Sequence, residues 1–370
     1  MTHWGGSWTR LARRRPWLIP ASAVIVIVIV AVVVWGLPGA RSVVGWWAGP
    51  RSIGVGTEGA DALAVSPDGR TLYAANWDEE GDSGGITVVN LSSGQAGRRI
   101  GIGGPAVQLV MMPDGRALYA LVELDDDGDR LVRVGLPTLR VDEQIAFTYG
   151  AEDMVAAPAG SLLYVLAGTS RGSMAVIPVD ADSGQERKAI PVPADSQSIA
   201  VSPDGRTLYI GTGNADGRGP GEVVAVDSRS GDAAKPVRFP HAVVGLAVSP
   251  DGRRLFGLAS SYQCPDGGTC GGRCDLAGID TMTGTALRPV RLDSGCARIE
   301  VAPDRGRLFV LSGDESLTVV NSVTGQVEKT IRTAGFIAGD GASDLLLAPD
   351  GRTVYVADQF KGVVVIPVAY

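Results

Sequence analysis

A repeated turn sequence limits the folds open to this chain more than any other feature. The string Ser-Pro-Asp-Gly-Arg occurs at 66–70, 202–206 and 249–253, and close variants occur at four further places. The seven turn prolines are Pro67, Pro113, Pro158, Pro203, Pro250, Pro303 and Pro349, separated by 46, 45, 45, 47, 53 and 46 residues. Six residues after each proline comes an aromatic: Tyr73, Tyr119, Tyr164, Tyr209, Phe256, Phe309 and Tyr355. Such a unit cannot bury its apolar faces alone, so neighbouring units must stack.

Each repeat unit has the pattern of four short strands. In the first unit we expect strands at 62–65, 71–76, 86–91 and 98–103, with the Pro-Asp-Gly turn between the first two. No convincing helical period occurs in residues 52–370, and the 51 Gly and 22 Pro residues suit a chain with many turns. The sequence therefore predicts an all-β domain over 51–370, a seven-bladed β-propeller of four-stranded blades.

The last unit lacks a fourth strand. After Pro349 the pattern gives strands only at 353–358 and 362–368. The segment Arg-Ser-Ile-Gly-Val-Gly at 51–56 matches the fourth strand of the first unit, Arg-Arg-Ile-Gly-Ile-Gly at 98–103. We therefore expect residues 51–56 to close the last blade as its outer strand.

The repeat resembles the YVTN family of β-propeller repeats. The similarity is carried by Leu-Ala-Val-Ser-Pro-Asp-Gly-Arg-Thr-Leu-Tyr at 63–73 with its copies, and by strands such as Ser-Leu-Thr-Val-Val-Asn at 316–321. The resemblance extends over the whole of 51–370 and implies a propeller fold. It leaves function open, because such repeats serve adhesion, binding and, in relatives, catalysis. WD40-like repeats match less well, since no Gly-His opening or Trp-Asp ending recurs.

The N-terminus has the pattern of a signal-anchor. Residues 16–40 are uncharged, and at 1.5 Å per residue they are long enough as a helix to span the ~30 Å hydrocarbon core. Four arginines between Arg10 and Arg15 precede the run, so residues 1–15 are expected in the cytoplasm. We expect a linker at 41–50 and a single-pass cell-membrane protein with an extracellular propeller. The alternative is a cleaved signal peptide, against which the length of the run and Pro38 argue.

The distribution of charge argues against nucleic-acid binding. Five of the 33 Lys and Arg residues lie in residues 1–50, which contain no acid. Residues 51–370 therefore carry 28 basic and 40 acidic side chains, a net charge of −12. No basic cluster is visible along this part of the sequence, whereas binding to a phosphate backbone depends on Lys and Arg.

Acidic residues gather in loops opposite the Pro-Asp-Gly turns, on the face that we call the top. Two second-to-third strand loops, 76–82 and 123–129, are strongly acidic, and blade-to-blade connections add further carboxylates. These loops are interpreted as a solvated rim, a divalent cation site or a dock for a basic partner. An EF-hand is not expected, because Val134 stands where that loop needs Glu. The candidate binding residues are Asp61, Asp78, Glu79, Asp82, Asp125, Asp126, Asp127, Asp153 and Asp344.

The four cysteines fall near the fifth and sixth units. Cys264, Cys270 and Cys274 lie in one long loop, and Cys296 lies on the connection into the sixth blade. An even number of cysteines outside the membrane indicates two disulfides, with Cys264–Cys270 and Cys274–Cys296 preferred. A four-cysteine zinc site is the alternative, although its usual paired C-x2-C spacing is absent.

The sequence contains no convincing catalytic motif. Gly-Asp-Ser-Gly-Gly at 81–85 and Gly-Thr-Ser-Arg-Gly at 168–172 match nucleophile strings but lack the required partners or helix. His241, in the connection into the fifth blade, could be a base or a ligand, but no partner for it is recognisable in the sequence and a structural role is favoured.

The function predicted from these patterns is a non-catalytic cell-surface scaffold that binds a protein or small ligand through its top face. We expect this face to point away from the membrane. No cofactor is expected to be required, although calcium or magnesium could bind the acidic loops. One alternative is a metal-assisted lactonase- or lyase-like enzyme at the central funnel, with Asp61, Asp153 and Asp344 as ligands. A structural envelope protein is the other.

Overall fold

The computed structural model describes residues 50–56, 59–76, 84–124, 128–136, 138–147, 150–170, 172–213, 219–263, 271–292, 296–303, 306–312, 316–333 and 342–368. The chain divides into two units, residues 1–48 and 49–370, and every described residue belongs to the second. The expected cytoplasmic segment and transmembrane helix lie outside the described residues and stay predictions. Within the described ranges, no helix has the length and apolar character to cross a membrane.

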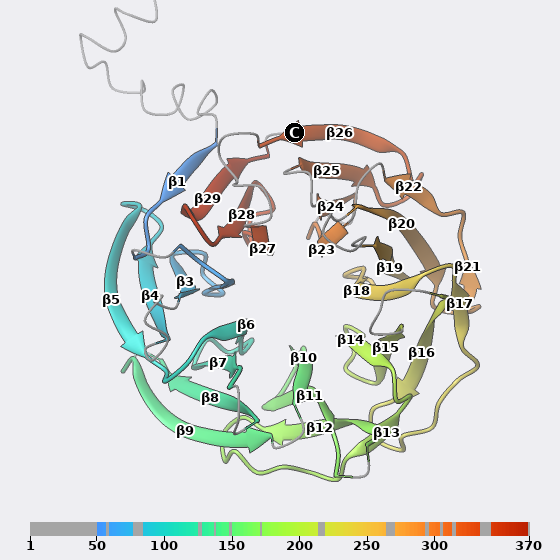
Figure 1. The fold of residues 1–370 in the computed structure, drawn as a ribbon, viewed down its shortest axis with the longest axis horizontal. Coiled ribbons are helices and arrows are strands. Elements are labelled where there is room, and N and C mark those ends of the chain that lie inside the picture. Colours follow the sequence, from blue (N-terminus) through green and yellow to red (C-terminus); the bar gives the residue numbers. More distant parts are fainter. Residues whose placement is uncertain are drawn as a thin grey trace, which may run out of the picture. The chain divides into compact units, whose positions relative to one another are not determined.

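The second unit is a seven-bladed β-propeller. Seven antiparallel sheets surround a central axis, with the first strand of each blade innermost (Figure 1). Blades 1 to 3 contain β2–β5 (Ala62–Val65, Thr71–Asn76, Gly85–Asn90, Gln95–Gly101), β6–β9 (Ala106–Met111, Ala117–Val122, Asp129–Gly135, Arg140–Phe147) and β10–β13 (Ala151–Ala156, Leu162–Gly168, Met174–Asp180, Ile190–Val192). The four strands expected in the first unit are present, and their bounds differ from the expected ones by three residues at most.

The remaining blades follow the same order. Blades 4 and 5 contain β14–β17 (Ser196–Val201, Thr207–Thr212, Gly221–Asp227, Val237–Phe239) and β18–β22 (Ala242–Val248, Arg254–Gln263, Gly271–Asp280, Thr285–Ala286, Val290–Leu292). Blades 6 and 7 contain β23–β26 (Cys296–Val301, Arg307–Ser312, Ser316–Asn321, Val327–Arg332) and β27–β29 (Ala342–Leu347, Thr353–Asp358, Gly362–Pro367) followed by β1 (Arg51–Ile53). In blade 5, β21 and β22 both pair with β20, so they are two halves of one interrupted outer strand.

The repeated turn sequence is explained by its hydrogen bonds. In blade 4, Ser202 Oγ donates to Asp204 Oδ1 at 2.6 Å, and the same oxygen accepts from the Arg206 N–H at 3.1 Å. Ser202 Oγ also accepts from the Thr207 N–H at 2.9 Å. The glycine that follows, Gly205, has a φ of 71°, which side chains with a Cβ rarely adopt. Blades 1 and 5 repeat this network residue for residue.

The hydrophobic core is divided among the seven blade boundaries. Each of seven apolar clusters combines side chains from two neighbouring blades, and the repeated aromatic residues are buried in these clusters, between 0% and 8% exposed. The boundary between blades 7 and 1 contributes one of them, so the apolar packing continues around the complete ring.

Blade 7 is completed from the N-terminal side of the domain. β1 pairs antiparallel with β29, with Arg51 opposite Val365 and Ile53 opposite Val363. The strand spans three residues, fewer than the six expected. Val55 lies beyond it but is still buried, and its carbonyl accepts hydrogen bonds from Asn76 Nδ2 at 3.0 Å and Thr87 Oγ1 at 2.7 Å.

Candidate functional site

The inner strands enclose a central channel with a volume of about 370 Å³. All seven blades contribute to its wall: Leu63, residues 107–110, residues 152–155, Gln197, Ile199, residues 244–246, residues 298–300 and residues 344–346. Four of the lining side chains are acidic and one is basic, so the channel carries an excess of carboxylates.

Two of the candidate carboxylates occupy the same position of the repeat, five residues before the turn proline. The residues at this position are Ala62, Gln108, Asp153, Ser198, Gly245, Arg298 and Asp344. In six of the seven inner strands the pairing register shifts immediately before it. Such a bulge re-aims the following side chain, which here reaches toward the next blade.

Asp153 and Asp344 hold neighbouring blades together. Asp153 Oδ2 accepts from the Ile199 N–H of blade 4 at 2.9 Å, and Asp344 Oδ2 accepts from the Leu63 N–H of blade 1 at 2.9 Å. Gln108 makes the same kind of bond to blade 3, because its Oε1 accepts from the Met154 N–H at 2.9 Å. Each of these N–H groups lies on an innermost strand, whose free edge has no further strand to pair with.

The second oxygen of each carboxylate is also engaged. Asp153 Oδ1 accepts from Gln108 Nε2 at 2.7 Å, and Asp344 Oδ1 lies 3.5 Å from Arg298 Nε. Burial raises the pKa of both aspartates, while their hydrogen bonds and the Arg298 charge act in the opposite direction. The structure thus gives both residues a role in joining blades, which sequence analysis did not foresee.

Glu300 is a channel residue that sequence analysis missed. It lies three residues before its turn proline, where the other blades carry only apolar residues: Ala64, Val110, Val155, Ala200, Ala247 and Leu346. Burial, together with the nearby charge of Asp344, raises the pKa of Glu300 to about 8. An alignment of the seven repeat units would have shown this carboxylate at a position that is apolar in the other six.

Acidic residues gather at the top mouth of the channel beside blades 2 and 3. Burial raises the pKa of Glu152, and repulsion from the charges of Asp129 and Glu123 adds to the rise. The Asp129 carboxylate also accepts a hydrogen bond from the Ala151 N–H. We call Glu123, Asp129 and Glu152 the acidic sector.

The remaining candidate aspartates are only partly described. Asp61 is half-buried, which raises its pKa, and it accepts a hydrogen bond from Gln359 Nε2 at 3.0 Å. Among the described residues, His, Cys, Asp and Glu side chains form no group of three that could hold a metal ion. The other candidates lie outside the described residues: Asp78, Glu79, Asp82, Asp125, Asp126 and Asp127.

His241 lies away from the channel, in blade 5. Its Nε2 is 4.0 Å from Asp275 Oδ2, and Arg291 Nε lies 3.6 Å from Asp275 Oδ1. Asp275 is buried in the third strand of the blade. The histidine therefore does have a carboxylate neighbour, one that lies 34 residues further along the chain.

Cys274 lies on β20, where it is fully buried and disulfide-bonded. Its backbone pairs with Leu292 on β22. Cys264 and Cys270 lie outside the described residues, as does the side chain of Cys296. The pairing of the four cysteines therefore stays a prediction.

These observations define a seven-bladed propeller with a channel whose polar groups join the blades. Among solved structures, a similar chain belongs to hydrazine synthase from Kuenenia stuttgartiensis, with a TM-score of 0.69 and 18% sequence identity. The match covers 85% of this chain and 96% of that one. At this identity the likeness concerns the fold alone. No protein-family model and no curated protein matches the sequence.

Proposed function

We propose that this protein is a non-catalytic binding propeller of the YVTN type, anchored at the cell surface, whose top face binds a basic partner. The observation that carries the proposal is the acidic sector, in which Asp129 and Glu123 already repel the charge on Glu152. A cationic partner would relieve that repulsion. The acidic loops 76–82 and 123–129 join second to third strands, and we expect them on the same top face, although 77–82 and 125–127 lie outside the described residues.

The state of the channel favours binding over metal-assisted catalysis. In the lactonase- or lyase-like alternative, Asp61, Asp153 and Asp344 would be ligands of a metal. Asp153 and Asp344 instead accept hydrogen bonds from the backbone of the next blade, and releasing them would leave edge N–H groups without acceptors. A structural envelope role remains the second alternative, and a bound partner would distinguish it from the proposed function.

The direction of β1 supports an outward-pointing top face. β29 ends at Pro367, which pairs with Thr353 just after the Pro349 turn, and Arg51 begins β1 at that same end of the blade. The chain therefore enters the propeller on the face of the Pro-Asp-Gly turns. If residues 16–40 span the membrane, this turn face is directed toward the lipid. Protease added to intact cells should then cut within 76–85 or 123–130 before it cuts the 157–161 turn.

A calorimetric titration of the full-length protein tests the proposed partner chemistry. Oligolysine serves as the basic probe, with calcium and magnesium chloride titrated separately. We expect Glu152→Gln combined with Glu123→Gln to weaken oligolysine binding about fivefold to tenfold, in the range of a partly screened charge pair. Asp126→Asn with Asp127→Asn should weaken any divalent ion binding.

Asp114→Asn is the matched control, because Asp114 is an exposed acid on the turn face of blade 2. It should leave both titrations unchanged. If neither oligolysine nor either ion at millimolar concentration gives heat, the acidic sector is a solvated rim that binds no cationic partner. Pull-down of the full-length protein from its own envelope, with metal analysis of the same sample, would then separate a scaffold from a structural protein.

A further inference from the structure

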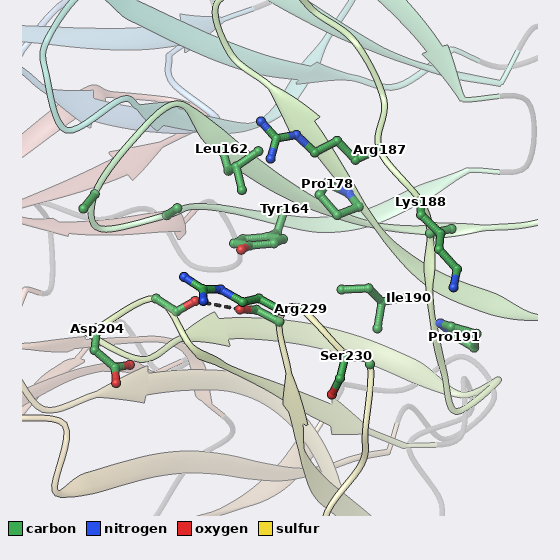
Figure 2. A pocket seen from close by; sticks show the side chains of 16 residues that line it. Leu162, Tyr164, Pro178, Arg187, Lys188, Ile190, Pro191, Asp204, Arg229 and Ser230 are labelled. Atoms are coloured by element: carbon green, nitrogen blue, oxygen red, sulfur yellow. Dashed lines mark hydrogen bonds between the residues drawn. The ribbon is translucent and has the colours of Figure 1, made fainter.

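A second and larger cavity opens between blades 3 and 4, with a volume of about 680 Å³. We call it the blade 3–4 groove. Its walls are the outer part of blade 3 at residues 187–191 and two turns of blade 4 at 204–205 and 228–231 (Figure 2). Both blade 4 turns lie on the turn face, so the groove is separate from the top face and from the channel.

The outer strand of blade 3 is irregular where it borders the groove. β13 covers only the first three residues of β12, from Met174 to Val176. The chain before it is held by a single bridge between Val179 and Glu186 and by a hydrogen bond from the Arg187 N–H to the Pro178 carbonyl. This segment therefore departs from a regular fourth strand and carries Arg187 and Lys188 along one wall of the cavity.

The floor of the groove is apolar. Ala157, Tyr164, Pro178 and Ile190 are buried side chains that line it, and Leu162 adds a partly buried one. In Figure 2 the Tyr164 ring lies between the labelled Arg187 and Arg229 side chains. Cavities of roughly 300–1,000 Å³ with an apolar lining and a few placed polar groups are typical of small-molecule sites.

The rim of the groove is basic in a domain that is otherwise acidic. Arg187 and Lys188 come from blade 3 and Arg229 comes from blade 4, while Asp204 is the one acid among the described lining residues. Arg187 already pairs with Asp180 at 2.8 Å, which holds the pKa of that carboxyl at about 2. Among the described residues, Lys188 and Arg229 form no side-chain ion pair, although the charge of Arg229 is close enough to Asp227 to contribute to lowering the pKa of that carboxyl.

The two lining serine hydroxyls are already used as donors. Ser228 Oγ donates to the Gly205 carbonyl at 2.8 Å, and Ser230 Oγ donates to Asp232 at 2.7 Å. The side chains left to contact a ligand are therefore the Tyr164 hydroxyl, which can donate or accept, and the cationic side chains, which donate only. A neutral polar ligand would leave them without a charged acceptor, whereas an anion would bridge the two blades.

We propose that the blade 3–4 groove binds a small organic anion, with its apolar body on the Tyr164 floor and its phosphate, sulfate or carboxylate attracted by Arg229 and Lys188, whose side chains lie apart on the two sides of the groove in Figure 2. Arg187 provides a third positive charge on the blade 3 wall. The site is independent of the acidic sector, because it lies on the opposite face and selects the opposite charge. A ligand that contacts both blades should also stabilise the folded ring by mass action.

Calorimetry on the full-length protein tests this site with phenyl phosphate as the probe. Inorganic phosphate supplies the charge without the ring, and benzyl alcohol supplies the ring without the charge. We expect phenyl phosphate to bind most tightly and benzyl alcohol to give no heat. Arg229→Gln and Lys188→Gln should each weaken binding about tenfold, as expected for loss of one charge-assisted contact. The double variant should bind too weakly to measure.

Arg116→Gln is the matched control, since Arg116 is a highly exposed arginine on the turn face of blade 2. It should bind phenyl phosphate like the unaltered protein. The exchanged side chains are exposed, and an unchanged melting temperature without ligand will show that the variants fold. Failure of the unaltered protein to bind phenyl phosphate, or equal binding by the double variant, would overturn the proposal. Neither result depends on oligolysine binding at the acidic sector.

Discussion

At the scale of single residues, the role of a carboxylate depends on its position in the repeat unit. Asp153 and Asp344 resemble metal ligands in the sequence, but the bulge before each one directs the side chain to an edge N–H of the next blade. Glu300 occupies a repeat position that is apolar in the other six blades, and no described N–H group donates to its carboxylate. The ionisation of Glu300 should therefore oppose folding, with no backbone hydrogen bond to offset the cost of burying the charge.

Replacing Glu300 by Gln should remove a pH-dependent loss of stability. The folded state favours the protonated Glu300 carboxyl over the ionised one. The contribution of this group to the free energy of unfolding is therefore fully present below about pH 4.5 and is lost as the pH rises through about 8. Glu300→Gln should match the unaltered protein near pH 4.5 and exceed its free energy of unfolding at pH 8.5 by about 1–3 kcal/mol, since the partly covered side chain meets some water.

Urea unfolding at both pH values provides the measurement. Glu222→Gln is the control, because Glu222 is a partly exposed acid outside the channel that pairs with Arg238 at 3.3 Å. This control should keep the pH dependence of the unaltered protein. Parallel pH profiles for Glu300→Gln and the unaltered protein would contradict the assignment.

At the scale of strands and turns, local sequence predicted most of what the structure contains. The Ser-Pro-Asp-Gly-Arg string encodes its own turn through Ser and Asp side chains, so the turn needs no distant partner. The outer strands were less predictable. In blades 4 and 5 a proline stands directly before the last part of the outer strand, and in blade 3 Pro191 lies within a strand of three residues. The blade 3–4 groove escaped notice for this reason, since Lys188 and Arg229 are 41 residues apart in the chain.

Gly205→Ala should report the free-energy cost of a positive φ at the glycine of this turn, with little contribution from steric clashes. A Cβ at Gly205 would meet nothing closer than Pro158 Cδ at 3.9 Å, so space is available, but φ is 71°. We expect a loss of about 1 kcal/mol in the free energy of unfolding. Gly101→Ala is the control in β5, where a Cβ meets no atom within 4 Å and φ is not positive. The urea midpoint should fall for the first variant and hold or rise for the second.

At the scale of the whole domain, stability depends on closing the ring. Seven clusters span seven boundaries, and the boundary between blades 7 and 1 includes Ile53 and Val55 from the segment that precedes blade 1. The match between 51–56 and 98–103 was enough to predict this closure from the sequence. The hydrogen bonds from Asn76 and Thr87 to the Val55 carbonyl could not be foreseen, because they depend on the side chains of blade 1.

A chain that starts at Gly59 should lose cooperative unfolding. It lacks β1 and Val55, so β29 becomes an open edge, and the Asn76 and Thr87 side chains lose a buried acceptor. A chain that starts at Gly49 keeps both and is the control. Calorimetric melting should show one sharp transition for the longer chain and a broad or early one for the shorter chain. Identical melting curves would show that closure by β1 is dispensable.

Because β1 pairs with β29, blade 7 is closed like the other blades, and the position of the chain ends within the ring is not essential to the fold. Val368 donates its N–H to the Arg352 carbonyl, as Leu91 does to Arg70 and Ser228 does to Arg206 in blades whose third and fourth strands are joined by a turn. Blade 7 therefore has the same four-strand arrangement as the other blades. It differs only in that no turn joins its third strand, β29, to its outer strand, β1. A circular permutant that links Val368 to Arg51 through a four-residue turn of the Asn90–Gln95 kind, and opens instead at 91–94, should fold to the same ring.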